Sequence, residues 1–95
     1  MYAQNGAHNN SFRYNYDSNF DILYLFIGPP ELSYEDELEP NIFLRYSEES
    51  EELRGALIMN YKYFDTKELK RKLPLHVDFN KINKDIFPSK KADSN

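Results

Sequence analysis

Apolar and polar side chains alternate over short runs in residues 12–60, a spacing that is typical of strands half-buried in a sheet. The alternation is regular at 12–16 and again at 42–46. Between them, the run 22–27 (Ile-Leu-Tyr-Leu-Phe-Ile) is apolar at every position, which predicts a strand covered on both faces. We therefore expect 22–27 to be the central strand of a sheet, ended by the Gly-Pro-Pro sequence that follows it.

Two further runs complete the predicted sheet. Residues 32–39 alternate loosely among acidic residues, as expected for an edge strand whose charges oppose edge-to-edge aggregation. Residues 53–60 form the last predicted strand, and a polar connection of hairpin length at 47–52 joins it to the strand before. Gly55 within this last strand indicates a bulge or a close approach of the backbone.

The clearest helix signal begins at Asp65. Asp65 and Glu68 match a capping box, basic residues follow in the last turn, and Pro74 stops the helix. Beyond it, a short strand or extended segment is predicted at 75–79. Asn80 is then expected to cap a second, short helix.

These elements predict an α+β fold: a small antiparallel sheet of about four strands, with the C-terminal helix at 65–73 packed on one face. Residues 12–87 are expected to form a single domain, because a chain of 95 residues supports one modest core. Residues 1–11 and 88–95 lack periodicity and are interpreted as flexible tails.

Composition narrows the classes of function. The chain has no cysteine, which excludes disulfides, thiolate metal sites and a cysteine nucleophile. Its longest apolar run has six residues, too short for a membrane span or a signal-peptide core, so we expect a cytoplasmic protein. The three glycines are scattered, and no serine stands in a nucleophile-elbow sequence. We therefore expect no enzyme activity and no cofactor.

Charge is distributed unevenly along the chain. Residues 1–54 hold eleven acidic residues against three arginines, a formal balance of −8. Residues 55–95 hold nine basic against five acidic residues, a balance of +4. A split of this kind bears on the choice of partner and the rate of association rather than on the fold. The acidic part indicates a basic partner.

Four short motifs in residues 14–60 follow one another in a recognisable order. They are Tyr16-Asp17, Asp21-Ile22-Leu23-Tyr24-Leu25, an acidic stretch from Ser33 to Glu39-Pro40-Asn41-Ile42, and Leu53-Arg54-Gly55-Ala56-Leu57-Ile58. In this order and spacing the chain resembles the YuzE-like family, short bacterial proteins with a domain of unknown function. Asn41 stands where that family has glycine, and asparagine is the next best residue for a left-handed backbone. The resemblance implies a small antiparallel sheet with a packed helix, no catalytic residues, and an antitoxin-like role beside a small toxin-type protein.

The first candidate site is the set Glu35, Glu37 and Glu39, whose alternate positions place the carboxylates on one face of the edge strand. One interpretation is a metal-dependent hydrolase or nuclease that uses these carboxylates. Oxygen-only metal sites, however, draw their ligands from several elements of a fold. We therefore favour a solvated, charged edge without a metal, to which Tyr34 contributes because tyrosine is enriched at interfaces.

Lys70 and Arg71 belong to a second candidate surface, the basic helix at 65–73. An alternative function is nucleic-acid binding through this helix, with Tyr61 and Tyr63 available for stacking on bases. The net charge of −4 argues against it, since nucleic-acid-binding domains are typically basic.

We predict a non-enzymatic protein-binding module, either an antitoxin-like inhibitor or a small accessory subunit. Its acidic sheet edge would meet a basic protein partner, for example a toxin-type protein. Assembly into a homodimer is compatible with this prediction, whereas contact with a membrane is not expected.

Overall fold

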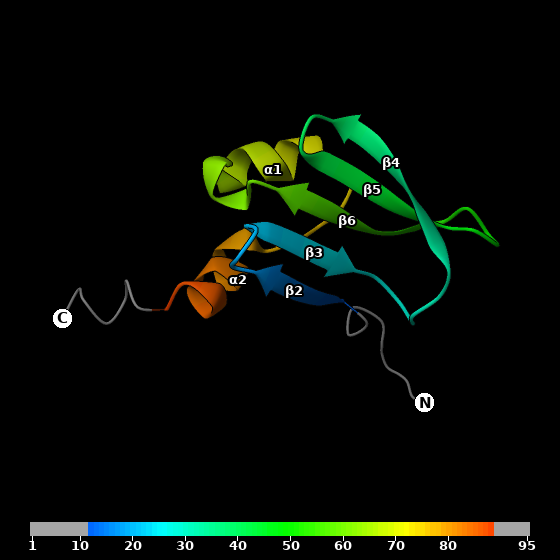
Figure 1. Cartoon of the computed structure of the whole chain (residues 1–95), viewed down its shortest axis with the longest axis horizontal. Helices are drawn as coiled ribbons and strands as arrows, with labels where there is room; N and C mark the ends of the chain where they lie inside the picture. Colours follow the sequence, from blue (N-terminus) through cyan, green and yellow to red (C-terminus); the bar gives the residue numbers. More distant parts are fainter. Residues whose placement is uncertain (1–11, 89–95) are drawn as a thin grey trace. The chain divides into compact units, whose positions relative to one another are not determined.

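The computed structural model describes residues 12–88, so the tails predicted at 1–11 and 88–95 lie outside the described residues, Pro88 excepted. The chain divides after Tyr61 into two compact units, named here the sheet unit and the helical unit. Five antiparallel strands form the described part of the sheet unit, in the order β2-β3-β6-β5-β4 (Figure 1). The strands are β2 (Arg13–Asp17), β3 (Ile22–Phe26), β4 (Ser33–Glu39), β5 (Ile42–Ser47) and β6 (Leu53–Met59).

The α+β class and the positions of these strands confirm the prediction, but the described sheet has five strands where about four were expected. The strand order corrects the predicted centre of the sheet. β6 is the middle strand, because it pairs with β3 on one side and with β5 on the other. The crossover from β3 to β4 therefore passes β6 and β5 before β4 begins. β3 is an inner strand of which only one face is fully covered: Leu23 and Leu25 are buried, whereas Tyr24 and Phe26 are half-buried.

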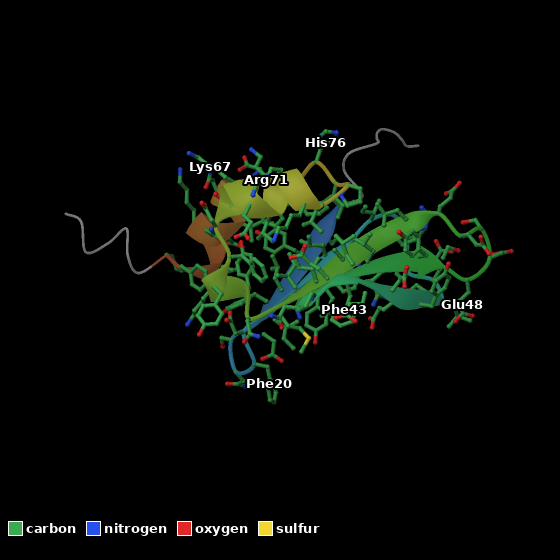
Figure 2. All side chains as sticks on the ribbon, turned by 90° about the horizontal axis from the view of Figure 1, so that it is seen from above. Phe20, Phe43, Glu48, Lys67, Arg71 and His76 are labelled. Carbon is green, nitrogen blue, oxygen red and sulfur yellow. The ribbon has the colours of Figure 1, made fainter. Side chains whose placement is uncertain are left out.

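The two faces of the sheet differ in burial, as the register of cross-strand partners shows. The buried face carries six apolar side chains, each at most 6% exposed: Leu23, Leu25, Ile42, Leu44, Ala56 and Ile58. The opposite face, named here the open face, is half-buried and carries Tyr24, Phe26, Phe43 and Leu57. Figure 2 shows Phe43 projecting from the sheet. Both faces of the sheet therefore carry apolar side chains, but only the buried face is removed from water.

Residues 27–32 form the crossover from β3 to β4 and pass one end of the sheet. The backbone N–H of Ile27 donates to the carbonyl of Arg54 at 2.8 Å, and Pro29 and Pro30 then stiffen the path. Glu31 anchors the crossover with its carboxylate, which accepts hydrogen bonds from Nε of Arg54 and from Oγ of Ser47. The crossover is thus held against the beginning of β6 and the end of β5.

Gly55 in β6 confirms both predictions for its position. The register between β5 and β6 shifts between Arg45 and Tyr46, beside Gly55, so the ladder bulges there. The backbone of Gly55 (φ +149°) also lies against the carbonyl of Leu25, where a Cβ on residue 55 would collide with the oxygen. Glycine combines this φ with so close an approach without strain.

Two turns of the sheet unit have the conformations that their residues favour. Asp17 accepts hydrogen bonds from the backbone N–H groups of Asn19 at 3.0 Å and Phe20 at 3.3 Å, which closes the turn after β2. Asn41 has φ +76°, the left-handed conformation expected at this position, and joins β4 to β5.

The helical unit begins within a 3-10 turn, Tyr61–Tyr63, and continues in α1 (Thr66–Lys72). Asp65 caps α1 by accepting from the backbone N–H of Lys67 at 3.3 Å, and the Glu68 carboxylate accepts in return from the backbone N–H of Asp65. The predicted capping box is therefore confirmed. α1 ends at Lys72, with Leu73 as its C-cap, immediately before Pro74.

The second helix, α2 (Phe79–Ile86), starts earlier than expected. Its cap is Asp78, which accepts from the backbone N–H of Lys81 at 3.1 Å, so Asn80 lies inside the first turn and does not cap the helix. Residues 75–78 form no strand, and Phe79, where the predicted strand or extended segment was to end, belongs to α2. The packing of α1 on the sheet stays a prediction. Within residues 12–88 no helix is long and apolar enough to cross a membrane.

Candidate functional site

β4 is the last strand on one side of the described sheet, and β5 is its neighbour. Five of its seven residues are exposed. No described strand pairs with its outer side, named here the β4 edge. An edge of this kind presents backbone N–H and C=O groups in the geometry that an added strand needs.

A bulge at Leu38 separates the three predicted carboxylates. Glu35 and Glu37 stand opposite residues of the open face, whereas Glu39 stands opposite Ile42 of the buried face. The prediction that all three carboxylates share one face is therefore wrong. The physical reason is the extra residue of the bulge, which reverses the alternation of faces beyond it.

Glu35 has a partner of its own on the open face. Its carboxylate accepts from the guanidinium of Arg45 at 2.8 Å, and the same guanidinium donates to Oγ of Ser33 at 2.8 Å. Among residues 12–88, no group of three or more histidine, aspartate or glutamate side chains is arranged to hold a metal ion. Glu37 is exposed, one position along the same face, and leaves a carboxylate directed to solvent.

Apolar and aromatic side chains are exposed beside these acids. Tyr34 is 43% exposed, and its ring packs on Tyr46 of β5 with centroids 5.7 Å apart. Desolvation raises the pKa of Tyr34, and the charges of nearby carboxylates add to this effect. Leu38, at the bulge, is also 43% exposed, and Leu32, just before β4, is 78% exposed. The β4 edge thus combines negative charge with apolar surface.

The predicted basic residues lie in the other unit. Lys70 and Arg71 are exposed in the last turn of α1, as predicted. Lys67 and Arg71 are one helical turn apart and project from the same side of α1 (Figure 2). Lys72 adds less to the positive charge of this surface, since its ammonium group forms an ion pair with the Glu68 carboxylate at 3.0 Å. The sequence placed these residues on a helix correctly, and their role stays a prediction.

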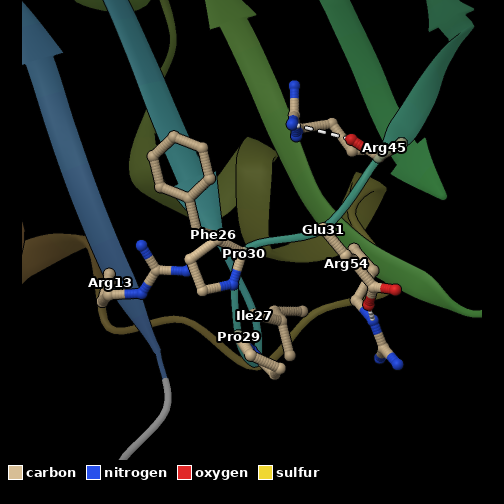
Figure 3. A pocket seen from close by; sticks show the side chains of 9 residues that line it. Arg13, Phe26, Ile27, Pro29, Pro30, Glu31, Arg45 and Arg54 are labelled. Atoms are coloured by element: carbon tan, nitrogen blue, oxygen red, sulfur yellow. Dashed lines mark hydrogen bonds and ion pairs between the residues drawn. The ribbon is translucent and has the colours of Figure 1, made fainter. Parts of the chain in front are cut away.

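A pocket of about 150 Å³ opens at the end of the sheet where the crossover passes (Figure 3). We call it the arginine pocket, because Arg13 of β2, Arg45 of β5 and Arg54 of β6 line it. Phe26, the last residue of β3, also lines the pocket. The guanidinium carbon of Arg13 lies 5.2 Å from the centre of the Phe26 ring, and that of Arg45 lies 5.4 Å from it. Both distances are those of cation–π contacts. The other lining residues are Ile27, Pro29, Pro30, Glu31 and Ser33.

The three guanidiniums differ in their partners. Arg54 is paired with Glu31 and, at 3.0 Å, with Glu52, which raises the pKa of Arg54 further. Arg45 is paired with Glu35. Arg13 donates to the backbone carbonyl of Gly28 at 2.8 Å and contacts no carboxylate among the described residues.

Sequence reasoning missed the arginine pocket. The signal was present in the type of basic residue: all three basic residues in residues 12–61 are arginines, and lysine first appears at position 62. Each arginine lies within two residues of a strand end on the same side of the sheet, so the topology brings them together. That convergence depends on strand order, which local patterns do not encode.

Comparison with known proteins gives one relationship. No curated protein and no solved structure gives a significant match to the chain. The family model described as a protein of unknown function (DUF2283) matches residues 13–60, which is the whole of the described sheet from β2 to β6. Since this match covers more than half of the 95 residues, the chain belongs to the DUF2283 family of proteins of unknown function.

Proposed function

We propose that this protein is a non-enzymatic protein-binding module whose β4 edge receives an extended segment of a partner. The single observation that carries the proposal is the outer side of β4, a seven-residue strand that pairs with β5 on its inner side and with no described strand on its outer side. Backbone hydrogen bonds along such an edge give affinity to any extended chain, and the neighbouring side chains select among partners.

The side chains at the β4 edge favour a basic partner. Glu37 and Asp36 are exposed on opposite faces of β4, so an added strand meets a carboxylate on either face. The sheet unit as a whole carries eleven acidic residues against three arginines within residues 1–61, and this excess steers basic proteins toward it. Tyr34 and Leu38 supply the apolar contacts that charge alone lacks.

The same charges disfavour pairing of one β4 edge with another. In such a pair the carboxylates of two copies would lie across from each other, and like charges that face each other destabilise a sheet. The bulge at Leu38 also interrupts a regular edge-to-edge ladder. A homodimer, if it forms, is therefore expected to use another surface.

The biological role that fits this proposal is that of an antitoxin-like inhibitor or a small accessory subunit. The resemblance to the YuzE-like bacterial family supports a small toxin-type protein as the partner. An acidic module that covers a basic surface blocks that surface from nucleic acid or other anions, which is one way for a small protein without catalysis to inhibit.

The test measures association of the partner recovered from the native host over a series of salt concentrations. The double variant Asp36→Asn/Glu37→Gln removes two charges from the β4 edge and leaves the Glu35–Arg45 ion pair intact. We expect association at low salt to slow by about tenfold and its salt dependence to flatten, because opposed potentials accelerate encounter.

Two control variants make the result specific. Glu48→Gln/Glu49→Gln removes the same charge from the exposed hairpin between β5 and β6 and should change association by less than about twofold. Lys70→Gln/Arg71→Gln tests the basic helix. If this last variant loses binding while the β4-edge variant keeps it, the proposal is wrong, and α1 is the working surface.

A further inference from the structure

We propose that the arginine pocket binds a carboxylate attached to a small apolar group. The pocket collects Arg13, Arg45 and Arg54, the three basic residues of residues 12–61, from strands that are distant in sequence. A guanidinium presents its N–H donors in a planar fork that matches the two oxygens of a carboxylate. This inference is independent of the proposed protein-binding function, since it concerns the open face and the crossover rather than the β4 edge.

Two of the three arginines already bind a carboxylate within the protein. Arg45 and Arg54 bind carboxylates of the protein itself, those of Glu35 and Glu31. Arg13 has the same chemistry, but the described residues offer it a single carbonyl oxygen and the ring of Phe26. A guanidinium has five N–H donors, so most of those of Arg13 are available to a ligand. Arg13 is therefore the group that a further carboxylate would reach first.

The surroundings favour a ligand with a single negative charge. The sheet unit has an excess of acidic residues, which repels phosphates and nucleic acid more strongly than it repels a monoanion. The volume of about 150 Å³ is well below that of pockets that hold drug-sized ligands, so the occupant is a small molecule or one end of a larger one.

The walls of the pocket favour an apolar group next to the carboxylate. Phe26 of the open face and Ile27, Pro29 and Pro30 of the crossover face the same space as the guanidiniums. Short aliphatic acids and the carboxyl-terminal residue of a polypeptide share this chemistry. The two sources differ in whether an amide-linked chain leads away from the carboxylate.

The experiment titrates isotope-labelled protein with sodium isobutyrate at constant ionic strength and follows the backbone amide resonances by NMR. We expect saturable shifts at Gly28 and Glu31 and at Arg54, which border the pocket. Neutral isobutyramide and inorganic phosphate should bind at least about tenfold more weakly. Isobutyramide lacks the charge, whereas phosphate lacks the apolar group and, with its higher charge, is repelled more strongly by the acidic residues of the sheet unit.

Arg13→Gln is the decisive variant, with Arg71→Gln of the helical unit as the control for loss of one exposed positive charge. We expect about tenfold weaker isobutyrate binding in the first and less than twofold change in the second. Equal binding of isobutyrate and isobutyramide, tighter binding of phosphate, or equal behaviour of the two variants would each overturn the inference.

A second titration distinguishes the sources. A four-residue peptide that ends in valine is compared as the free acid and as the carboxyl-terminal amide. Tighter binding of the free-acid peptide than of isobutyrate assigns the pocket to a polypeptide end, and the reverse order assigns it to a small acid. If neither carboxylate shifts the pocket resonances, the inference is wrong.

Discussion

Glu31 and Arg54 form an ion pair that fastens the crossover between β3 and β4 to the start of β6. The other oxygen of the Glu31 carboxylate accepts from the hydroxyl of Ser47, which is fully buried, at 3.0 Å. The hydrogen bond from Arg54, followed by that from Ser47, lowers the pKa of Glu31 below its ordinary value. The folded protein thus holds Glu31 as an anion, which makes stability depend on pH.

The first prediction concerns acid. Because the pKa of Glu31 is lower in the folded than in the unfolded chain, its contribution to stability is complete above the ordinary value of 4.5 and is lost as the pH falls through the lower folded-state pKa. Glu31→Gln should therefore be less stable than the parent protein at pH 7, and the difference should shrink in acid. Urea unfolding followed by circular dichroism from neutral to acid pH measures it. Glu48→Gln, in the exposed hairpin, is the control; a difference that stays constant over the pH series would contradict the prediction.

The second prediction concerns the approach of β6 to β3. Gly55→Ala should lower the free energy of unfolding by about 3 kcal/mol or more, because the new Cβ collides with the Leu25 carbonyl as well as straining a positive φ. Gly28→Ala is the matched control: its φ is +78°, but nothing lies within 4 Å of the added Cβ. Only the backbone strain remains there, about 1–2 kcal/mol. If thermal unfolding shows that both variants lose the same free energy of unfolding, the close approach is not the reason for glycine at position 55.

The third prediction concerns the core. Leu25→Ala should cost about 2–5 kcal/mol, since Leu25 is fully buried and its removal leaves a cavity. Leu32→Ala makes the same change at a side chain that is 78% exposed and should cost less than about 0.5 kcal/mol. Urea unfolding of both variants decides the matter. A small loss at Leu25 would mean that the buried face of the sheet is not the centre of stability.

Local structure was largely predictable from the sequence because its causes are local. Alternation marks β2 and β5, Asp17 closes its turn with its own carboxylate, and Asp65 with Glu68 forms the capping box. Each of these depends on residues a few positions apart, whose spacing the sequence states directly.

The features that sequence reasoning missed depend on long-range pairing or on competition. The position of β6 at the centre follows from its pairing with β3, in which the partner residues are 29 to 37 positions apart. The bulge at Leu38 carries no glycine or proline to mark it, yet it moves Glu39 to the other face. Asp78 and Asn80 are both good caps, and the choice between them depends on which helix start buries Phe79 and Ile82. The arginine pocket needs the crossover and the strand order together.

The last prediction concerns alkaline pH and the end of the sheet opposite to the arginine pocket. Tyr16 donates its hydroxyl to the Asp21 carboxylate at 2.7 Å. Burial, then this hydrogen bond and the charges of Asp21 and Asp17, raise the pKa of Tyr16 to about 12 from its ordinary value of 10.0. A tyrosine whose pKa is raised by folding stabilises the protein fully below the unfolded value, and this contribution is lost as the pH rises through the folded one.

The Tyr16→Phe variant isolates this effect. Its absorbance titration should lack an ionisation step near pH 12 that the parent protein shows. Its stability should be lower than that of the parent at pH 8, and the difference should narrow as the pH rises from 10 to 12, because the parent then loses the neutral hydroxyl that Asp21 binds. Tyr63→Phe removes a tyrosine that is 87% exposed and serves as the control with the same tyrosine count. If both variants lose the same titration step, Asp21 does not raise the pKa of Tyr16. The predicted dependence of stability on alkaline pH is then wrong.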